Sequence, residues 1–113
     1  MHDTSLRGKA ALVTGSVGGI GLAVATALGA QGAAVMLNGL EPPAAAEPAL
    51  STLRALGIDA RYHQADLADP HAIERLVAEA IAAFGNVDIL VNNAVIRHFA
   101  PVDAFPPQAW DRA

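Results

Sequence analysis

The sequence predicts an α/β fold in which a parallel sheet carries helices on its faces. Three observations predict it: short apolar runs alternate with helix-like stretches, glycines close those stretches, and a glycine-rich octet at residues 14–21 follows the first run. Right-handed crossovers give the strand order 3-2-1-4 and place the octet at the carboxyl edge, beside the reversal of order between strands one and four. This is a Rossmann-type arrangement, and we expect it to be incomplete because 113 residues are few for such a sheet.

The first strand and helix occupy the start of the chain. Residues 9–13 form a short apolar run typical of a buried parallel strand, and residues 34–37 form a second one. Between them, residues 19–31 predict a helix that ends at Gly32. Besides several alanines, the predicted apolar face of that helix carries Ile20, Leu22, Val24 and Leu28.

The middle of the chain repeats the pattern. The Pro- and Ala-rich residues 41–48 predict a loop, and residues 49–56 a short helix before Gly57. Alternation over residues 60–64 predicts the third strand. The Asp-Pro pair at 69–70 predicts an N-cap with proline at the first helical position, ahead of a helix over residues 72–84 that closes at Gly85.

The last predicted strand covers residues 87–91. A loop is expected to about residue 105, and the Pro-Pro pair at 106–107 predicts the beginning of another helix. Residues 1–113 therefore predict part of one domain, without internal repeats.

The octet has the arrangement that cradles the pyrophosphate of a dinucleotide. Backbone N–H groups at a helix N-terminus face an anion there, and the helix dipole favours negative charge. Gly15 suits the turn, Gly19 permits close approach to phosphate, and Gly21 permits tight packing of helix on strand. No Gly-Lys-Ser/Thr follows, which disfavours a nucleoside triphosphate loop, and the flanking patterns favour a dinucleotide site over a flexible glycine turn.

Composition excludes several classes of protein. A hydrophobic content of 53% with 16% charged residues argues against disorder, and the net charge of −4 offers no basic surface for nucleic acid. There are no cysteines for disulfides or thiolate sites, and no apolar run approaches the roughly 18 residues of a membrane span. His71 and Glu74 supply too few ligands for a metal. We expect a cytoplasmic protein without metal or membrane contact.

Two further motifs join the octet: Asp66-Leu67 after the third strand and Asn92-Asn93-Ala94 after the fourth. Together the three motifs resemble the N-terminal half of the short-chain dehydrogenase/reductase family, over essentially all 113 residues. Segments 37–40, 88–94 and 105–111 are most similar to the bacterial D-beta-hydroxybutyrate dehydrogenases of that family. The resemblance implies a homotetrameric oxidoreductase that, when complete, transfers hydride between NAD and a hydroxy acid or alcohol.

The resemblance also implies which residues bind the cofactor. The octet would line the pyrophosphate and nicotinamide ribose, Asp66 would meet the adenine amino group beside Leu67, and Asn93 and Ala94 would contact the riboses. Asn92 is expected to tie neighbouring strands together instead. The implied set is Gly15, Ser16, Val17, Gly18, Gly19, Ile20, Gly21, Leu40, Asp66, Leu67, Asn93 and Ala94.

Some positions depart from the family pattern. Val95 replaces a usual glycine, and Gly39 stands where NAD-dependent members often carry an acid, the nearest one here being Glu41. NAD is favoured over NADP because no cation lies between residues 23 and 54. Arg97 and His98 are the candidate substrate residues; Arg97 would bind a carboxylate or remain a solvated surface charge.

No catalytic residue is predicted in this chain. The resemblance implies that a tyrosine transfers the proton and that a nearby lysine lowers the pKa of the tyrosine, in a Tyr-x-x-x-Lys motif. The only tyrosine, Tyr62, belongs to the predicted third strand, and the only lysine, Lys9, precedes the first. Three hypotheses stay open: the cofactor-binding half of a dehydrogenase, a nucleotide-binding module without catalysis, and an incompletely folded remnant whose fourth strand is an uncovered edge.

Overall fold

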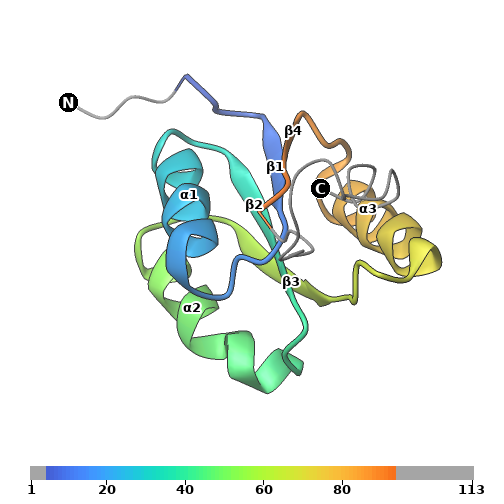
Figure 1. Ribbon diagram of the computed structural model, residues 1–113. Helices are drawn as coiled ribbons and strands as arrows, with labels where there is room; N and C mark the ends of the chain where they lie inside the picture. The colour runs from blue at the N-terminus through green and yellow to red at the C-terminus, as the bar shows by residue number, and fades with distance from the viewer. Residues whose placement is uncertain (1–4, 94–113) are drawn as a thin grey trace, which may run out of the picture.

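Four parallel strands form one sheet in the order β3-β2-β1-β4 (Figure 1). The computed structural model describes residues 5–93. The strands are β1 (Ala10–Val13), β2 (Ala34–Gly39), β3 (Ala60–Gln64) and β4 (Ile89–Val91). The predicted order is therefore confirmed. The all-apolar β1 is central and buried on both faces, which is why its sequence shows no alternation.

Three helices cover the two faces of the sheet (Figure 1). They are α1 (Gly19–Ala30), α2 (Pro43–Ala55) and α3 (Pro70–Phe84). Val13 and Leu37 belong to the core under α1 and α2, whereas Leu12 and Met36 belong to the core under α3. Alternate residues of each central strand thus contribute to opposite layers, and in sheets of this kind ligands bind at the carboxyl ends of the strands.

Helix α2 corrects the predicted loop over residues 41–48. The helix begins at Pro43 and continues through Pro48, six residues earlier than expected. Proline is favourable in the first turn, where its missing N–H has no intrahelical partner, and three alanines follow it. Pro48 is exposed, so the carbonyl that loses its partner can be hydrated. The helix buries Ala46, Ala49, Leu50 and Leu53 against the sheet.

Helix α1 corrects part of the predicted apolar face, since Leu22 and Leu28 pack against the core as expected but Ile20 does not. Its buried residues are Gly21, Ala25 and Gly29, spaced four apart, while Ile20 is 75% exposed. A Cβ on Gly29 would lie 2.7 Å from two Ile58 side-chain carbons. Small residues therefore form the contact stripe because α1 lies too close to its neighbours for larger ones.

The signals at the ends of α3 are confirmed. Asp69 Oδ1 accepts a hydrogen bond from the His71 N–H at 2.9 Å, and Gly85 closes the helix with φ +87°. The helix begins at Pro70, the predicted first helical position. Strand β4 begins two residues later than expected. Just before it, the Asp88 N–H donates to the Ala10 carbonyl and the Asp88 carboxylate accepts from the Ala10 N–H, both at 2.9 Å.

Candidate cofactor site at the carboxyl edge of the sheet

The turn after β1 is bonded to the segment after β4. Thr14 Oγ1 accepts from the Asn93 N–H at 2.9 Å and donates toward Asn92 Oδ1 at 3.2 Å. In return, Asn93 Nδ2 donates to the Gly15 carbonyl at 2.9 Å. The strand-tying role expected of Asn92 is present, and two of the three sequence motifs meet where the strand order reverses.

Asn38, at the end of β2, joins the same turn to the end of β3. Its side chain is 1% exposed, and its Oδ1 accepts from the Gly15 N–H at 3.3 Å. Its Nδ2 donates to the carbonyls of His63 and Ala65 at 3.2 and 3.3 Å. The Asn38 N–H donates to Ser16 Oγ at 3.0 Å, and the Asn38 carbonyl accepts from the Ser16 N–H at 2.7 Å. Every polar group of Asn38 is thus satisfied in a buried network.

Sequence reasoning missed Asn38 as a site residue. The available signal was an amide side chain that directly follows the four apolar residues 34–37 of a buried strand. A buried amide is costly without partners, so such a residue predicts a network around it.

The three glycines named from the octet have different geometries. Gly15 and Gly19 have φ of +57° and +60°, the left-handed region that favours glycine. A Cβ on Gly21 would overlap the Gly15 carbonyl oxygen and lie 2.8 Å from Asn93 Nδ2 and 2.9 Å from Ser16 Cα. The tight packing expected at Gly21 is therefore present.

The N-terminus of α1 is open. Its N-cap, Gly18, has extended backbone and no side chain to cap the helix, and the first turn carries no acid. Gly18 and Gly19 are exposed, and within residues 5–93 a Cβ on either would meet nothing within 4 Å. N–H groups that no described side chain caps, at exposed glycines, fit a pyrophosphate.

Ser16 behaves differently from its neighbours. Its side chain is fully buried, and Oγ donates to the Val13 carbonyl at 2.6 Å. Its N–H is bonded to Asn38. Since both polar groups are used inside the protein, Ser16 shapes the turn, and a ligand contact would require one of these bonds to be exchanged.

Two large apolar side chains are exposed. Ile20 is 75% exposed, and Leu40, in the loop after β2, is 66% exposed. Both belong to the predicted cofactor set. Exposed large apolar groups next to a polar anion site are suited to cover the flat face of a base or the edge of a ribose.

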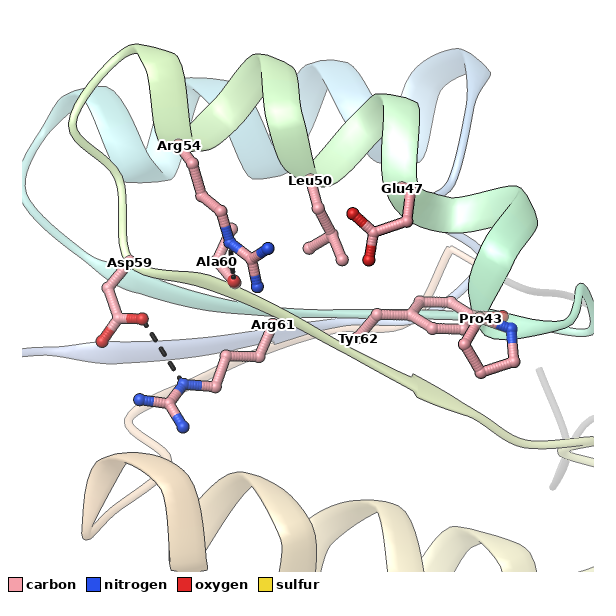
Figure 2. Close-up of a pocket in the computed structure, with 8 residues that line it drawn as sticks. All are labelled: Pro43, Glu47, Leu50, Arg54, Asp59, Ala60, Arg61 and Tyr62. Atoms are coloured by element: carbon pink, nitrogen blue, oxygen red, sulfur yellow. Dashed lines mark hydrogen bonds and ion pairs between the residues drawn. The ribbon is translucent and has the colours of Figure 1, made fainter.

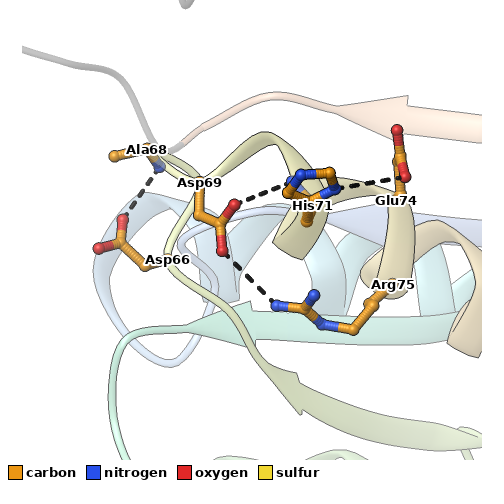
Figure 3. Close-up of polar contacts among 6 residues, drawn as sticks. All are labelled: Asp66, Ala68, Asp69, His71, Glu74 and Arg75. Carbon is orange, nitrogen blue, oxygen red and sulfur yellow. Dashed lines mark hydrogen bonds and ion pairs between the residues drawn. The ribbon is translucent and has the colours of Figure 1, made fainter.

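Asp66 and Leu67 follow β3 in the loop that leads to α3, and Figure 3 shows Asp66 in this loop. Asp66 is exposed, and its Oδ1 accepts from the Ala68 N–H at 3.0 Å. This contact leaves Asp66 Oδ2 available to accept from an amine. The Ala65 N–H donates to the Gly39 carbonyl at 3.1 Å, which fixes where the loop leaves the sheet.

The polar contacts beyond Asp66 cap the helix (Figure 3). Arg75 reaches Asp69 at 3.7 Å, and His71 reaches Glu74 at 4.0 Å, in strongly exposed pairs that contribute little to stability. Within residues 5–93, no group of three or more His, Cys, Asp or Glu is placed to hold a metal ion. The same residues contain no helix long and apolar enough to cross a membrane.

A cavity of about 420 Å³ lies between α2 and β3, away from the predicted cofactor residues (Figure 2). Arg54 Nε donates to the Ala60 carbonyl at 3.1 Å, and Arg61 pairs with Asp59 at 3.4 Å. Among the described residues β3 is an edge strand, and the Arg54 bond occupies a carbonyl that could otherwise pair with another chain. The cavity is lined by Pro43, Glu47, Leu50, Arg54, Asp59, Ala60, Arg61 and Tyr62.

Tyr62 spans from this cavity to the loop after β2. Its hydroxyl donates to the Glu41 carbonyl at 2.5 Å. Burial raises the pKa of the Tyr62 hydroxyl above its ordinary value, and the Glu41 charge raises that pKa further. The sole tyrosine therefore has a structural partner far from any lysine.

Three predicted residues, Ala94, Arg97 and His98, lie outside the described residues, as does Val95. The helix expected from Pro106 also lies outside them.

A parallel sheet with a glycine turn and an uncapped helix at the reversal of strand order defines a Rossmann-type dinucleotide-binding protein. The family model of short chain dehydrogenases matches residues 9–113. The chain belongs to that family.

Individual relatives agree with this assignment. The chain is 47% identical to the D-beta-hydroxybutyrate dehydrogenase of Cupriavidus necator, over 94% of this chain and 41% of that protein. It is 44% identical to versicolorin reductase 1 of Aspergillus parasiticus, over 95% of this chain and 41% of that protein. Thus the chain spans about two fifths of the length of the curated relatives that it matches.

Solved structures show the same fold. A dehydrogenase/reductase from Sinorhizobium meliloti superposes with a TM-score of 0.78 at 40% identity, covering 94% of this chain and 42% of that one. A short chain dehydrogenase from Burkholderia cenocepacia, solved in complex with NADP, gives a TM-score of 0.77 at 41% identity, covering 95% and 44%.

Proposed function

We propose that this chain binds NAD along the carboxyl edge of its sheet, as the nucleotide-binding part of an oxidoreductase. The observation that carries the proposal is the open N-terminus of α1, uncapped and preceded by the left-handed Gly15 turn. There the N–H groups of Val17 to Ile20 hold the pyrophosphate, and the free carboxylate oxygen of Asp66 accepts from the adenine amino group. Asn93 and Ala94 are the proposed ribose contacts.

The bound nicotinamide supplies hydride chemistry, and this chain supplies its orientation. In the complete protein, the proposed reaction moves hydride between the nicotinamide and a hydroxy acid or alcohol. The 47% identity to a D-beta-hydroxybutyrate dehydrogenase supports a 3-hydroxybutyrate-like substrate. Arg97 and His98 are the candidate substrate contacts, with Arg97 suited to a carboxylate.

NAD is proposed over NADP. A 2′-phosphate is usually met by an arginine or lysine, and residues 24–53 contain neither. The proposal extends to a homotetramer for the complete protein and to a cytoplasmic location, with which the lack of cysteines agrees.

A nucleotide-binding module without catalysis is the second candidate. It is favoured by the engagement of Tyr62, which hydrogen-bonds the loop after β2 and cannot act with Lys9 as an acid/base pair. Both candidates require cofactor binding, and they differ in whether hydride transfer follows it.

Titration of the full chain with NADH, followed by nicotinamide fluorescence, tests binding. We expect saturable enhancement. Thermal unfolding of the same sample is the control, because a cooperative transition shows that the sheet is formed. A chain that unfolds cooperatively yet shows no binding at millimolar NADH would exclude both candidates.

A further inference from the structure

The cavity between α2 and β3 has charges of opposite sign along one wall. Figure 2 shows Glu47, Leu50 and Arg54 pointing from α2 toward β3. Glu47 and Arg54 are seven residues apart, which is about two turns, or roughly 10 Å, along the helix. They therefore lie at the two ends of one helix face, with Leu50 between them.

Neither Glu47 nor Arg54 has an ion pair in the described part of the chain. Arg54 Nε donates to the Ala60 carbonyl at 3.1 Å, which orients the guanidinium and leaves its other nitrogens without a partner among the described residues. The other two charged residues of the lining, Asp59 and Arg61, pair with each other at 3.4 Å. The cavity thus offers a ligand one cationic fork of donors and one anionic acceptor.

The wall between these two charges suits an apolar group. Leu50 is 5% exposed, and the Tyr62 ring lies on the β3 side of the cavity, along the strand toward Pro43 (Figure 2). The cavity volume of about 420 Å³ is within the range of small-molecule sites, roughly 300–1,000 Å³. A ligand that fits these walls has a carboxylate at one end, an amine at the other and an apolar middle.

Tyr62 also offers its backbone to such a ligand. The Asp59 carbonyl and the Ala65 N–H are bonded to β2, so alternate residues counted from Asp59 face that strand. The Ala60 carbonyl faces the other way, where it accepts from Arg54. The N–H and carbonyl of Tyr62, two residues further on, therefore face the edge of β3 that no described strand covers.

We propose that this cavity binds a short zwitterionic peptide of about three residues as an antiparallel partner of β3. Its carboxylate pairs with Arg54 and its amine with Glu47, a separation of roughly 10 Å that three extended residues span. Helix α2 begins at the carboxyl edge of the sheet, where β3 ends, so a peptide with this polarity runs opposite to β3.

The antiparallel direction fits the rest of the cavity. The middle residue of the peptide exchanges two backbone hydrogen bonds with Tyr62. Directly opposed residues place their side chains on the same face of a sheet, so an apolar middle side chain packs on the Tyr62 ring and Leu50. The site is separate from the proposed cofactor residues, and the proposal stands without them.

The test uses the tripeptide Gly-Leu-Gly, free or with its amine acetylated or its carboxylate amidated. Binding to the full chain is measured by isothermal titration calorimetry and by the shift of the Tyr62 amide resonance. For the free peptide we expect a dissociation constant on the order of 1 mM. Either blocked peptide should bind about fivefold more weakly, because it loses one charged partner.

Variants assign each end of the peptide. Glu47→Gln should weaken binding of the free peptide about fivefold and leave binding of the acetylated peptide unchanged, because that peptide has already lost the contact. Arg54→Gln should weaken the free peptide and spare the amidated one in the same way. Glu79→Gln and Arg7→Gln are the matched controls, since both residues are exposed and neither lines the cavity.

The absence of both heat and a Tyr62 amide shift at about 10 mM peptide would overturn the proposal. Equal losses of the free and acetylated peptides in Glu47→Gln would overturn it too, because the effect would not depend on the amine. Thermal unfolding shows whether each variant is folded. Arg54→Gln also removes the bond to Ala60, so if it unfolds, Glu47→Gln and the blocked peptides decide the outcome. A folded chain that binds the peptide but not NADH contradicts the proposed function alone.

Discussion

Substitution of Gly21 by alanine should push the first turn of α1 away from the Gly15–Ser16 turn. The added methyl would overlap the Gly15 carbonyl oxygen and lie 2.9 Å from Ser16 Cα, both of which are backbone. It would also lie 2.8 Å from Asn93 Nδ2, which donates to that same carbonyl. Backbone cannot rotate away as a side chain can, so the first turn of α1 must shift.

Two destabilising effects and one stabilising effect set the expected change in the free energy of unfolding. Overpacking a tight contact costs typically about 1–3 kcal/mol. Loss of the hydrogen bond from Asn93 to Gly15 costs about 1 kcal/mol more. Alanine is the better helix former by about 1 kcal/mol. We therefore expect a net destabilisation of about 2 kcal/mol, with the N–H groups of α1 displaced from the pyrophosphate position.

Gly29→Ala is the matched control for Gly21→Ala. Gly29 is also a buried residue of α1, and the three atoms nearest to its added methyl are side-chain carbons of Ile58, 2.7 to 2.9 Å away. Both variants are measured by urea unfolding and by NADH titration. Gly21→Ala should weaken NADH binding at least about tenfold beyond any effect of Gly29→Ala. Equal NADH affinities in the two variants would refute the role assigned to the Gly21 contact.

Further predictions concern the network and the helix ends. Asn38→Asp should lower the free energy of unfolding by about 3 kcal/mol at neutral pH, because a carboxylate oxygen would face two carbonyls. In urea unfolding, this stability should recover toward the parent at acidic pH, where the protonated carboxyl donates again, and a loss of stability that does not change with pH would contradict the prediction. Asp69→Ala should lower the free energy of unfolding by about 1 kcal/mol, because it removes the cap on the His71 N–H. Asp69→Asn should be as stable as the parent, and both variants should bind NADH with the parent's affinity. Absorbance titration of the only tyrosine should give a Tyr62 pKa above its ordinary value of 10.0 in the folded chain and near that value in urea. Because the Tyr62 pKa is higher in the folded chain, the protonated hydroxyl contributes to the free energy of unfolding fully below pH 10, and this contribution is lost as pH rises through the folded pKa. Glu41→Gln should lower the Tyr62 pKa measured in the folded chain, because it removes the neighbouring negative charge.

The sheet order and the glycine turn could be predicted because their signals are local. Apolar runs bounded by glycines mark buried strands and helix ends, and the right-handed crossover rule leaves few arrangements of them. Gly85 and Asp69 act at the ends of α3 through contacts within a few residues of themselves. The left-handed turn at Gly15 and the tight contact at Gly21 are local in the same way, and both were expected from the octet.

The errors fall where distant parts of the chain decide the outcome. Ile20 fits a helical apolar stripe, yet the small residues Gly21 and Gly29 face the core because α1 lies close to the sheet. Pro48 locally opposes a helix, yet the burial of Leu50 and Leu53 outweighs it. Which residues of α1 are buried, and whether α2 continues through Pro48, depend on how closely the helices pack on the sheet. A short stretch of sequence does not determine that distance.

Asn38 shows how this edge of the sheet makes one site from separate motifs. The amide that receives the Gly15 N–H also donates to the Ala65 carbonyl, one residue before Asp66. The pyrophosphate end and the adenine end of the proposed cofactor site are therefore joined through a single buried side chain. Because an amide cannot make both contacts after a large shift of either segment, the distance between the two ends is fixed before binding. A dinucleotide of matching length would then pay little to order the site, whereas a mononucleotide would gain only one end of it.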